Sequence, residues 1–215
     1  MKDTKKILIK IGSNVLTLEN GLPDVKRIGK LVEQVAELRK KGTQVILVSS
    51  GAVAAGRSKL PSTTSLDTIS RRQVLASIGQ VELMKIYSTL FCENDLICSQ
   101  VLVTKEDFRT RQHYLNMKNC LEALLKCGIT PIINENDVIS ITELMFTDND
   151  ELSGLVAAIL DVDSLIILTN VDGVFSGNPE NPESKLISEY DEKQINLEAI
   201  IVGKKSNFGR GGMVA

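Results

Sequence analysis

The sequence has 215 residues, with 43% hydrophobic and 24% charged residues and a net charge of -2. A chain of this length fits one domain and can bury roughly 70% of its unfolded surface, and this composition is ordinary for a globular protein, which excludes disorder on a large scale. The small negative charge supplies no basic field, so we expect no nucleic-acid partner, although a small phosphorylated ligand stays open.

Short apolar strands alternate with amphipathic helices along most of the chain. Predicted strands cover residues 5–11, 44–48, 96–103, 129–133 and 164–168. Predicted helices cover residues 24–42, 52–56, 70–92, 111–127, 153–160 and 196–202. Such alternation predicts an α/β fold in one domain, with a mostly parallel sheet, right-handed crossovers and helices on both faces.

Three segments break this alternation. Residues 58–68 combine Pro61 with a run of Ser and Thr, which predicts an exposed loop. A short hairpin is predicted at residues 138–146. After Phe175 the chain becomes polar, and Asn-Pro pairs at residues 178–179 and 181–182 indicate turns.

The cysteines indicate neither a metal site nor disulfides. None of the four has C-x-x-C spacing, and His113 is the single histidine. We expect buried thiols in a reducing compartment, with Cys120 and Cys127 on the core face of one helix. The apolar run at the N-terminus is too short for a signal peptide and no segment is long enough to span a bilayer, which predicts a cytoplasmic protein with no membrane partner.

Two clusters of polar side chains follow the strand predicted at residues 129–133, one before and one after the predicted hairpin. Asn134 and Asp137 follow this strand, and Asn149 and Asp150 lead into the next helix. Polar groups beside a buried strand cost free energy unless hydrogen bonds, cations or a ligand satisfy them. Ordinary Asx turns would account for either cluster alone. Because loops at the carboxyl ends of parallel strands bind ligands, the two clusters together favour a binding site.

A second candidate site follows the first strand. Lys10 lies near the end of an otherwise apolar strand, and Gly12 and Ser13 come next. A lysine in a partly dry position is costly unless an anion neutralises it, although a lysine on an edge strand could extend to water. Glycines and small residues let backbone amides approach an anion. The combination favours a phosphate or carboxylate ligand.

Glycines also follow the strand at residues 44–48, in Ser49-Ser50-Gly51-Ala52, and recur at Gly209, Gly211 and Gly212 near the end of the chain. Neither the G-x-x-x-x-G-K-[ST] phosphate loop nor the G-x-G-x-x-G dinucleotide fingerprint follows a strand. Phosphate-loop kinases and Rossmann dehydrogenases are therefore disfavoured.

Six segments in the same order resemble the glutamate 5-kinases of proline biosynthesis, which belong to the amino acid kinase superfamily. The pair INEND and DNDELS separates these enzymes from the related aspartate, acetylglutamate and uridylate kinases. The segments are KIGSNVLT at residues 10–17, SSGAVAAG at 49–56, INEND at 133–137, DNDELS at 148–153, LTNVDGVF at 168–175 and GRGGM at 209–213.

This resemblance implies an amino acid kinase fold, a three-layer sandwich, and a reaction. The reaction is ATP-dependent phosphorylation of the γ-carboxylate of L-glutamate to L-glutamyl 5-phosphate, with Mg²⁺ arriving on the ATP. It also implies feedback inhibition by proline at the glutamate site and a homo-oligomer, either a dimer or a tetramer.

The resemblance further assigns roles to individual positions. The catalytic residues would be Lys10, which contacts the phosphates, and Asp150, which orients the lysines. Glutamate would be bound by Ser50, Gly51, Ala52, Asn134, Asp137 and Asn149. ATP would be bound by Lys10, Gly12, Ser13, Thr169, Asn170, Arg210, Gly211, Gly212 and Met213. No protein residue is assigned to the metal.

The sequence departs from the family pattern at three places. Asn170 replaces a usual Asp, Arg210 replaces a usual Thr, and the chain stops at Ala215. The family has a second catalytic lysine shortly after the methionine, then a further helix and strands, and many members append an RNA-binding-like domain. Residues 1–215 are thus expected to form one amino acid kinase domain, truncated at its C-terminal end and without that appended domain.

Two alternatives stay open beside a glutamate 5-kinase. One is another amino acid kinase with a different acceptor. The other is a domain of the same fold that senses an amino acid without turnover.

Overall fold

The computed structural model describes residues 4–60, 66–140, 149–176, 181 and 183–189. The helix predicted at residues 196–202 and most of the hairpin predicted at 138–146 lie outside the described residues. Residues 137–139 form a turn.

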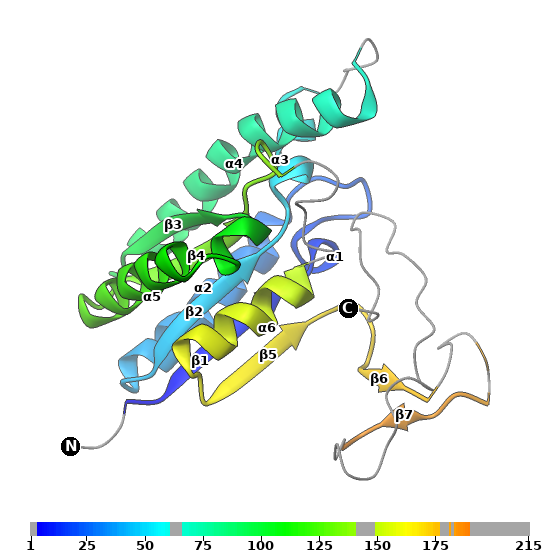
Figure 1. Cartoon of the computed structure of the whole chain (residues 1–215). Coiled ribbons are helices and arrows are strands. Elements are labelled where there is room, and N and C mark those ends of the chain that lie inside the picture. The colour runs from blue at the N-terminus through cyan, green and yellow to red at the C-terminus, as the bar shows by residue number, and fades with distance from the viewer. Residues whose placement is uncertain (1–3, 61–65, 141–148, 177–180, 182, 190–215) are drawn as a thin grey trace.

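Five parallel strands form the central sheet, in the order β3-β4-β2-β1-β5 (Figure 1). Their bounds are β1 Lys6–Ile11, β2 Gln44–Ser49, β3 Cys98–Val103, β4 Thr130–Glu135 and β5 Ser164–Leu168. All five predicted strands are present within two residues of the predicted ends. A separate antiparallel ribbon pairs β6, Val174–Phe175, with β7, Leu186–Ile187. Strands of two residues carry no periodicity, so the sequence did not predict this ribbon.

Helices α2 to α6 correspond to predicted helices, although α3 ends three residues later and α6 begins four residues earlier than predicted, and α1 and η1 were not predicted. Their bounds are α1 Ser13–Leu16, α2 Val25–Lys40, α3 Ala52–Lys59, α4 Thr68–Cys92, α5 Arg111–Lys126 and α6 Asn149–Leu160, with a 3-10 turn η1 at Lys105–Phe108. Asp24 caps α2 by accepting a hydrogen bond from the amide of Arg27, and Gly42 follows the helix with a φ of 83°. Both signals are the ones that set the predicted ends.

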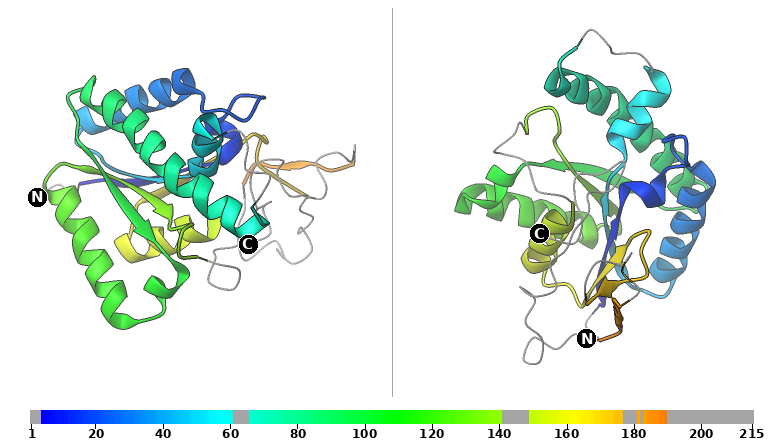
Figure 2. Two further views of the ribbon diagram at one scale, coloured as in Figure 1. Left: turned by 90° about the horizontal axis from the view of Figure 1, so that it is seen from above. Right: turned by 90° about the vertical axis from the view of Figure 1, so that its right-hand side faces the viewer.

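The sheet is covered on both faces, which confirms the three-layer prediction. Alternate residues of β1 point to opposite faces, as in any strand. Ile7, Ile9 and Ile11 pack in a core with α2 and α4, whereas Leu8 packs in a second core with α5 and α6. Seen from above, the blue α2 and teal α4 lie on one side of the sheet and the green α5 and yellow α6 on the other (Figure 2, left).

Helices α3 and α4 touch backbone to backbone at two glycines. A Cβ added at Gly56 would lie 1.9 Å from the carbonyl oxygen of Leu75, and one at Gly79 would lie 1.7 Å from the carbonyl oxygen of Ala52. Only glycine fits at either position. Because α3 begins directly after β2, this close contact ties the loop at residues 49–52 to α4.

The loop predicted at residues 58–68 is shorter than expected, since α3 continues to Lys59 and α4 begins at Thr68. Asp67 caps α4 by accepting from the amides of Ile69 and Ser70. Hydrogen bonding to the side chain of Ser70, and then to these amides, lowers the pKa of the exposed carboxyl group of Asp67. The described ends of this segment, including Ser58 and Leu66, are exposed as predicted, and residues 61–65 lie outside the described residues.

The prediction of buried cysteines is wrong. Cys92, Cys120 and Cys127 are exposed, and Cys98 is half-buried, which raises the pKa of its thiol. The seven-residue spacing of Cys120 and Cys127 predicted a shared face but could not say whether that face is buried. The core side of α5 carries Met117, Leu121 and Leu125, one turn apart, and these larger apolar side chains gain more from burial.

Candidate active site

The carboxyl ends of β1, β2 and β4 lie next to one another in the sheet. The pairing register aligns Lys10 of β1 with Val48 of β2, and Val48 with Ile133 of β4. Three neighbouring strands therefore end side by side, and the residues at their ends include Lys10, the Ser49-Ser50 pair and Asn134. The first turn of α6 contacts these residues, so the two polar clusters of the sequence come together.

Lys10 forms a buried ion pair with Asp150. The distance from Nζ to Oδ1 is 2.5 Å, with 9% of the Lys10 side chain and 26% of the Asp150 side chain exposed. Because β1 lies between β2 and β5, Lys10 is not on an edge strand, and the interpretation of a lysine that extends to water from an edge is wrong. Asp150 lies in the first turn of α6, where the helix dipole favours a carboxylate. The protein thus supplies one anion for this lysine.

Asn149 joins three elements through its side-chain amide. Its Nδ2 donates to Oγ of Ser50 at 2.8 Å and lies within reach of the Ser49 carbonyl at 3.1 Å and Oδ1 of Asn134 at 3.4 Å. Asn134, 4% exposed, in turn donates to Oε1 of Gln80 on α4 at 3.0 Å. This network holds predicted substrate-binding side chains in one polar cluster beside the Lys10 ion pair.

Two glycines keep the carboxyl ends of β1 and β2 accessible to a ligand. A Cβ at Gly12 would lie 3.2 Å from the Leu168 carbonyl, a tight contact, and 3.7 Å from Nζ of Lys10, so a side chain there would occupy space beside the ammonium group. Gly51 has a φ of 100°, a left-handed conformation, and precedes α3, whose first residue, Ala52, is buried. Ser13 likewise begins α1 directly after Gly12. Backbone amides at both places suit an anion.

Asp137 pairs with a residue that the sequence reasoning missed. Nη2 and Nε of Arg72 lie 2.5 Å and 3.0 Å from Oδ1 of Asp137, and Gln73 donates to the Val138 carbonyl at 2.7 Å. Both arginine and glutamine lie near the start of α4. No signal in the sequence points to Arg72, because it is 65 residues away and its immediate neighbour, Arg71, has the same side chain.

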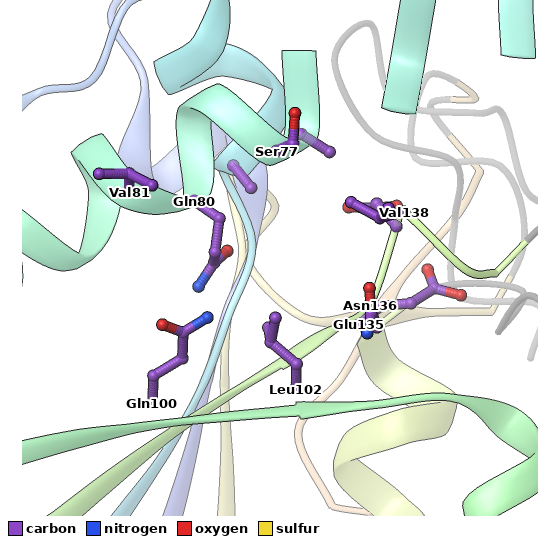
Figure 3. Close-up of a pocket in the computed structure, with 11 residues that line it drawn as sticks. Ser77, Gln80, Val81, Gln100, Leu102, Glu135, Asn136 and Val138 are labelled. Atoms are coloured by element: carbon purple, nitrogen blue, oxygen red, sulfur yellow. The ribbon is translucent and has the colours of Figure 1, made fainter. Parts of the chain in front are cut away.

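A cavity of about 260 Å³ adjoins Asp137 on the side of α4 and β3. In Figure 3, Gln80 of α4 and Gln100 of β3 point toward one another across it, and Leu102 and Val138 line its apolar part. Its lining includes Ala52 and Asp137, so it borders the polar cluster without containing Lys10.

The structure describes only some of the positions that are predicted to bind ATP. Thr169 and Asn170 follow β5 and are exposed, and the preceding Leu168 accepts a hydrogen bond from the Gly12 amide at 3.1 Å. Thr169 and Asn170 therefore directly follow β5, the strand that pairs with β1. Arg210, Gly211, Gly212 and Met213 lie outside the described residues.

The described part of the chain contains no group of three or more His, Cys, Asp or Glu side chains placed to hold a metal ion. Within the same residues, no helix combines the length and the apolar character that crossing a membrane requires.

Chemically, this edge of the sheet combines two kinds of group. Lys10 and the Ser13 amide suit a phosphate, whereas the Gly12 amide already donates to the Leu168 carbonyl. The hydroxyl, carboxamide and carboxylate side chains nearby suit a small molecule that carries both a positive and a negative charge. Such an arrangement can hold two anions side by side and stabilise charge that moves between them.

Residues 5–215 match the family model described as "Amino acid kinase family". The chain is 50% identical over 209 residues to a glutamate 5-kinase of Bacteroides thetaiotaomicron and 50% identical over 211 residues to one of Chlorobaculum tepidum. These alignments cover 97% and 98% of the chain, and the chain spans 58% of the length of each relative.

Among solved structures, the fold is similar to that of the carbamate kinase from Giardia lamblia bound to AMP-PNP. The TM-score is 0.57 with 21% sequence identity, and the match covers 87% of this chain and 78% of that one. At this identity the likeness concerns the fold, and it agrees with the parallel sheet and its two helical layers.

Proposed function

Because the chain belongs to the amino acid kinase family, we propose that it forms the catalytic domain of a glutamate 5-kinase, which uses ATP to convert L-glutamate to L-glutamyl 5-phosphate. Two observations support the substrate: the identity of 50% to two glutamate 5-kinases, and the motif pair INEND and DNDELS. The observation that carries the proposal is the buried pair of Lys10 and Asp150 beside the Asn149, Ser50 and Asn134 network.

The proposed reaction asks little covalent chemistry of the protein. A carboxylate oxygen is already a nucleophile, so it needs no general base, and the task is to align two anions that repel one another. Lys10 would neutralise charge on the transferring phosphoryl group. The ion pair with Asp150 would hold the Lys10 ammonium group at a fixed position, so it need not be ordered again in each turnover.

ATP would place its phosphates close to the backbone of Gly12 and Ser13, with Thr169, Asn170 and residues 210–213 as further contacts. The absence of a side chain at Gly12, next to Nζ of Lys10, supports a close approach of the phosphates at this place. Mg²⁺ normally accompanies ATP, bound mainly by phosphate oxygens and water, and it would offset phosphate charge during transfer.

Glutamate would occupy the polar cluster. Asp137, Asn134 and Asn149 offer acceptors for its ammonium group and amide donors for its carboxylates, and Ser50 with the amides of Gly51 and Ala52 would add further donors. Proline carries a similar amine and carboxylate, so we expect it to compete for this cluster as a feedback inhibitor. Proline inhibition that higher glutamate concentrations fail to relieve would contradict the shared site.

The oligomeric state and the cellular location of the enzyme are also part of the proposal. We expect a homodimer or homotetramer in the cytoplasm, in line with the reducing environment that the four cysteines indicated.

The test is ADP release by the full-length protein, measured with ATP, Mg²⁺ and one acceptor at a time. Release that depends on L-glutamate supports the proposal. Release with aspartate or UMP instead would identify a different acceptor, and amino-acid binding without any ADP release would identify a sensing domain.

A further inference from the structure

The ion pair between Arg72 and Asp137 has an arrangement that a structural bond alone does not require. Both hydrogen bonds from the guanidinium group, from Nη2 and from Nε, go to the same oxygen, Oδ1. A guanidinium and a carboxylate usually form two parallel bonds that use both oxygens. Among the described residues, no hydrogen bond engages Oδ2 of Asp137 or Nη1 of Arg72. The Oδ2 oxygen of Asp137 and both N–H groups of Nη1 thus stay available to a ligand.

The pair lies where a ligand can reach it. Only 10% of the Asp137 side chain is exposed, against 30% for Arg72, so the carboxylate is nearly enclosed while the guanidinium still borders solvent. Asp137 also follows Asn134 by three residues, and Asn134 belongs to the proposed glutamate cluster through Asn149. The Gln73 bond to Val138 fixes the same turn to α4.

The charges of the pair decide which ligand it accepts. A simple amine approaching Asp137 would also approach the Arg72 cation, and like charges at such short range repel one another. A carboxylate attached to the same carbon as the amine removes this obstacle, because it can face Arg72 while the ammonium faces Asp137. Adjacent opposite charges on the protein match adjacent opposite charges on the α-carbon of an amino acid.

We propose that Arg72 is a specificity-determining residue that binds the α-carboxylate of the substrate, paired with Asp137, which binds its α-ammonium. This inference rests on the proposed function, since it takes a free amino acid as the ligand. It adds Arg72 to the site and explains how the site would reject dicarboxylates without an amine and amines without an α-carboxylate.

The test measures equilibrium binding to the full-length protein by calorimetry, without ATP, for three ligands. L-Glutamate has both α-groups, glutarate lacks the ammonium, and 4-aminobutyrate lacks the α-carboxylate. The wild-type protein should bind glutamate at least 10-fold more tightly than either analogue. Arg72→Gln should weaken glutamate binding about 10- to 100-fold, the usual worth of a charge-assisted hydrogen bond, while 4-aminobutyrate binds equally well or more tightly.

Two further variants separate recognition from structure. Arg72→Lys keeps the cation and should recover part of the preference for glutamate over 4-aminobutyrate. Arg71→Gln removes the same charge from the neighbouring exposed position and should leave all three affinities unchanged. Thermal unfolding of each variant shows whether it is folded.

Equal weakening of glutamate and 4-aminobutyrate by Arg72→Gln would overturn the inference, because it would mean that Arg72 merely holds Asp137 in place. No change in either affinity would overturn it as well, and so would a wild-type protein that binds none of the three ligands. Selective glutamate binding without ADP release would instead refute the proposed function and leave the selectivity of the pair intact.

Discussion

For Lys10, the sequence predicted the chemistry of its position but not its protein partner. A lysine in an apolar strand needs an anion, and the structure supplies Asp150 at 2.5 Å, beside an interior strand of the sheet. A cation that is already paired does not need a permanently bound ligand to be stable there. In the proposed function it would contact the phosphoryl group while Asp150 holds it in place.

We therefore expect Lys10→Met to lower kcat at least 100-fold while the KM for glutamate changes less than about threefold, because the lysine acts on the moving phosphoryl group. Steady-state kinetics of the full-length protein at saturating ATP measure both constants. Lys41→Met, at an exposed position after α2, serves as the control and should leave both unchanged.

Asp137→Ala should show the opposite pattern, with a raised KM for glutamate and a smaller change in kcat, since Asp137 contacts the proposed substrate rather than the phosphoryl group. If the two variants exchanged these effects, the assignment of Lys10 to phosphate and Asp137 to glutamate would have to be reversed.

Tyr87 is a second buried polar residue at this level of the sheet. It is fully buried on α4, and its hydroxyl lies 2.9 Å from Oγ of Ser49. Burial raises the pKa of Tyr87 well above its ordinary value of 10.0, and the Ser49 hydrogen bond opposes this only in part. The tyrosine therefore stays neutral in the folded protein at pH values where it ionises in the unfolded chain.

A raised pKa in the folded state contributes stability that is complete below the unfolded pKa, near 10, and is lost as the pH rises from there toward the folded pKa. Tyr87→Phe should cost about 1 kcal/mol of unfolding free energy at pH 7, from the lost hydrogen bond. Above pH 10 the wild-type protein loses stability because Tyr87 ionises in the unfolded chain, whereas the variant has no tyrosine at this position. The cost of the substitution should therefore shrink by about 1.4 kcal/mol per pH unit above pH 10. Urea unfolding at pH 7, 10 and 11 checks both statements, and a cost that is constant with pH would contradict the second.

At the scale of elements, the contact between α3 and α4 links the fold to the site. The crossing at Gly56 and Gly79 fixes α4 against the helix that starts at Ala52. From there α4 extends Gln80 to Asn134 and Arg72 to Asp137. Helix α4 thus fixes the loops after β2 and β4 relative to one another.

Gly79→Ala should destabilise the protein by about 1–3 kcal/mol, because the new methyl group would overlap the Ala52 carbonyl and the backbone must move. Gly154→Ala is the matched control: it also lies in a helix, and no atom lies within 4 Å of the added Cβ. This control should stabilise the protein by about 0.5–1 kcal/mol through helix propensity. Chemical denaturation of both variants provides the measurement, and equal effects of one sign would refute the role assigned to the crossing.

At the scale of the whole molecule, β5 forms one edge of the described sheet and is its most exposed strand. Leu165, Ile166 and Ile167 are 38–40% exposed, whereas the equivalent residues of β1 are buried. The chain spans 58% of the length of the two glutamate 5-kinases to which it is 50% identical.

Much of the fold was predictable from local patterns. The five strands, the long helices and their caps follow from periodicity, Asp24 and Gly42, because these signals act over a few residues. The motifs at residues 10–17, 133–137 and 148–153 likewise indicated which loops carry polar side chains. The side of α5 that is buried did not follow, since spacing alone does not say which face has a neighbour.

The sequence by itself determined the alternation of strands and helices, the polar loops at the strand ends and the resemblance to a family of kinases. Only the tertiary structure decided the strand order, which makes β1 an interior strand, and the partners of its charges, Asp150 for Lys10 and Arg72 for Asp137. This difference arises from distance along the chain, because periodicity reflects neighbours only a few residues apart. The two ion pairs join residues that are 140 and 65 positions apart, and the packing of α4 and α6 against the sheet brings these residues together.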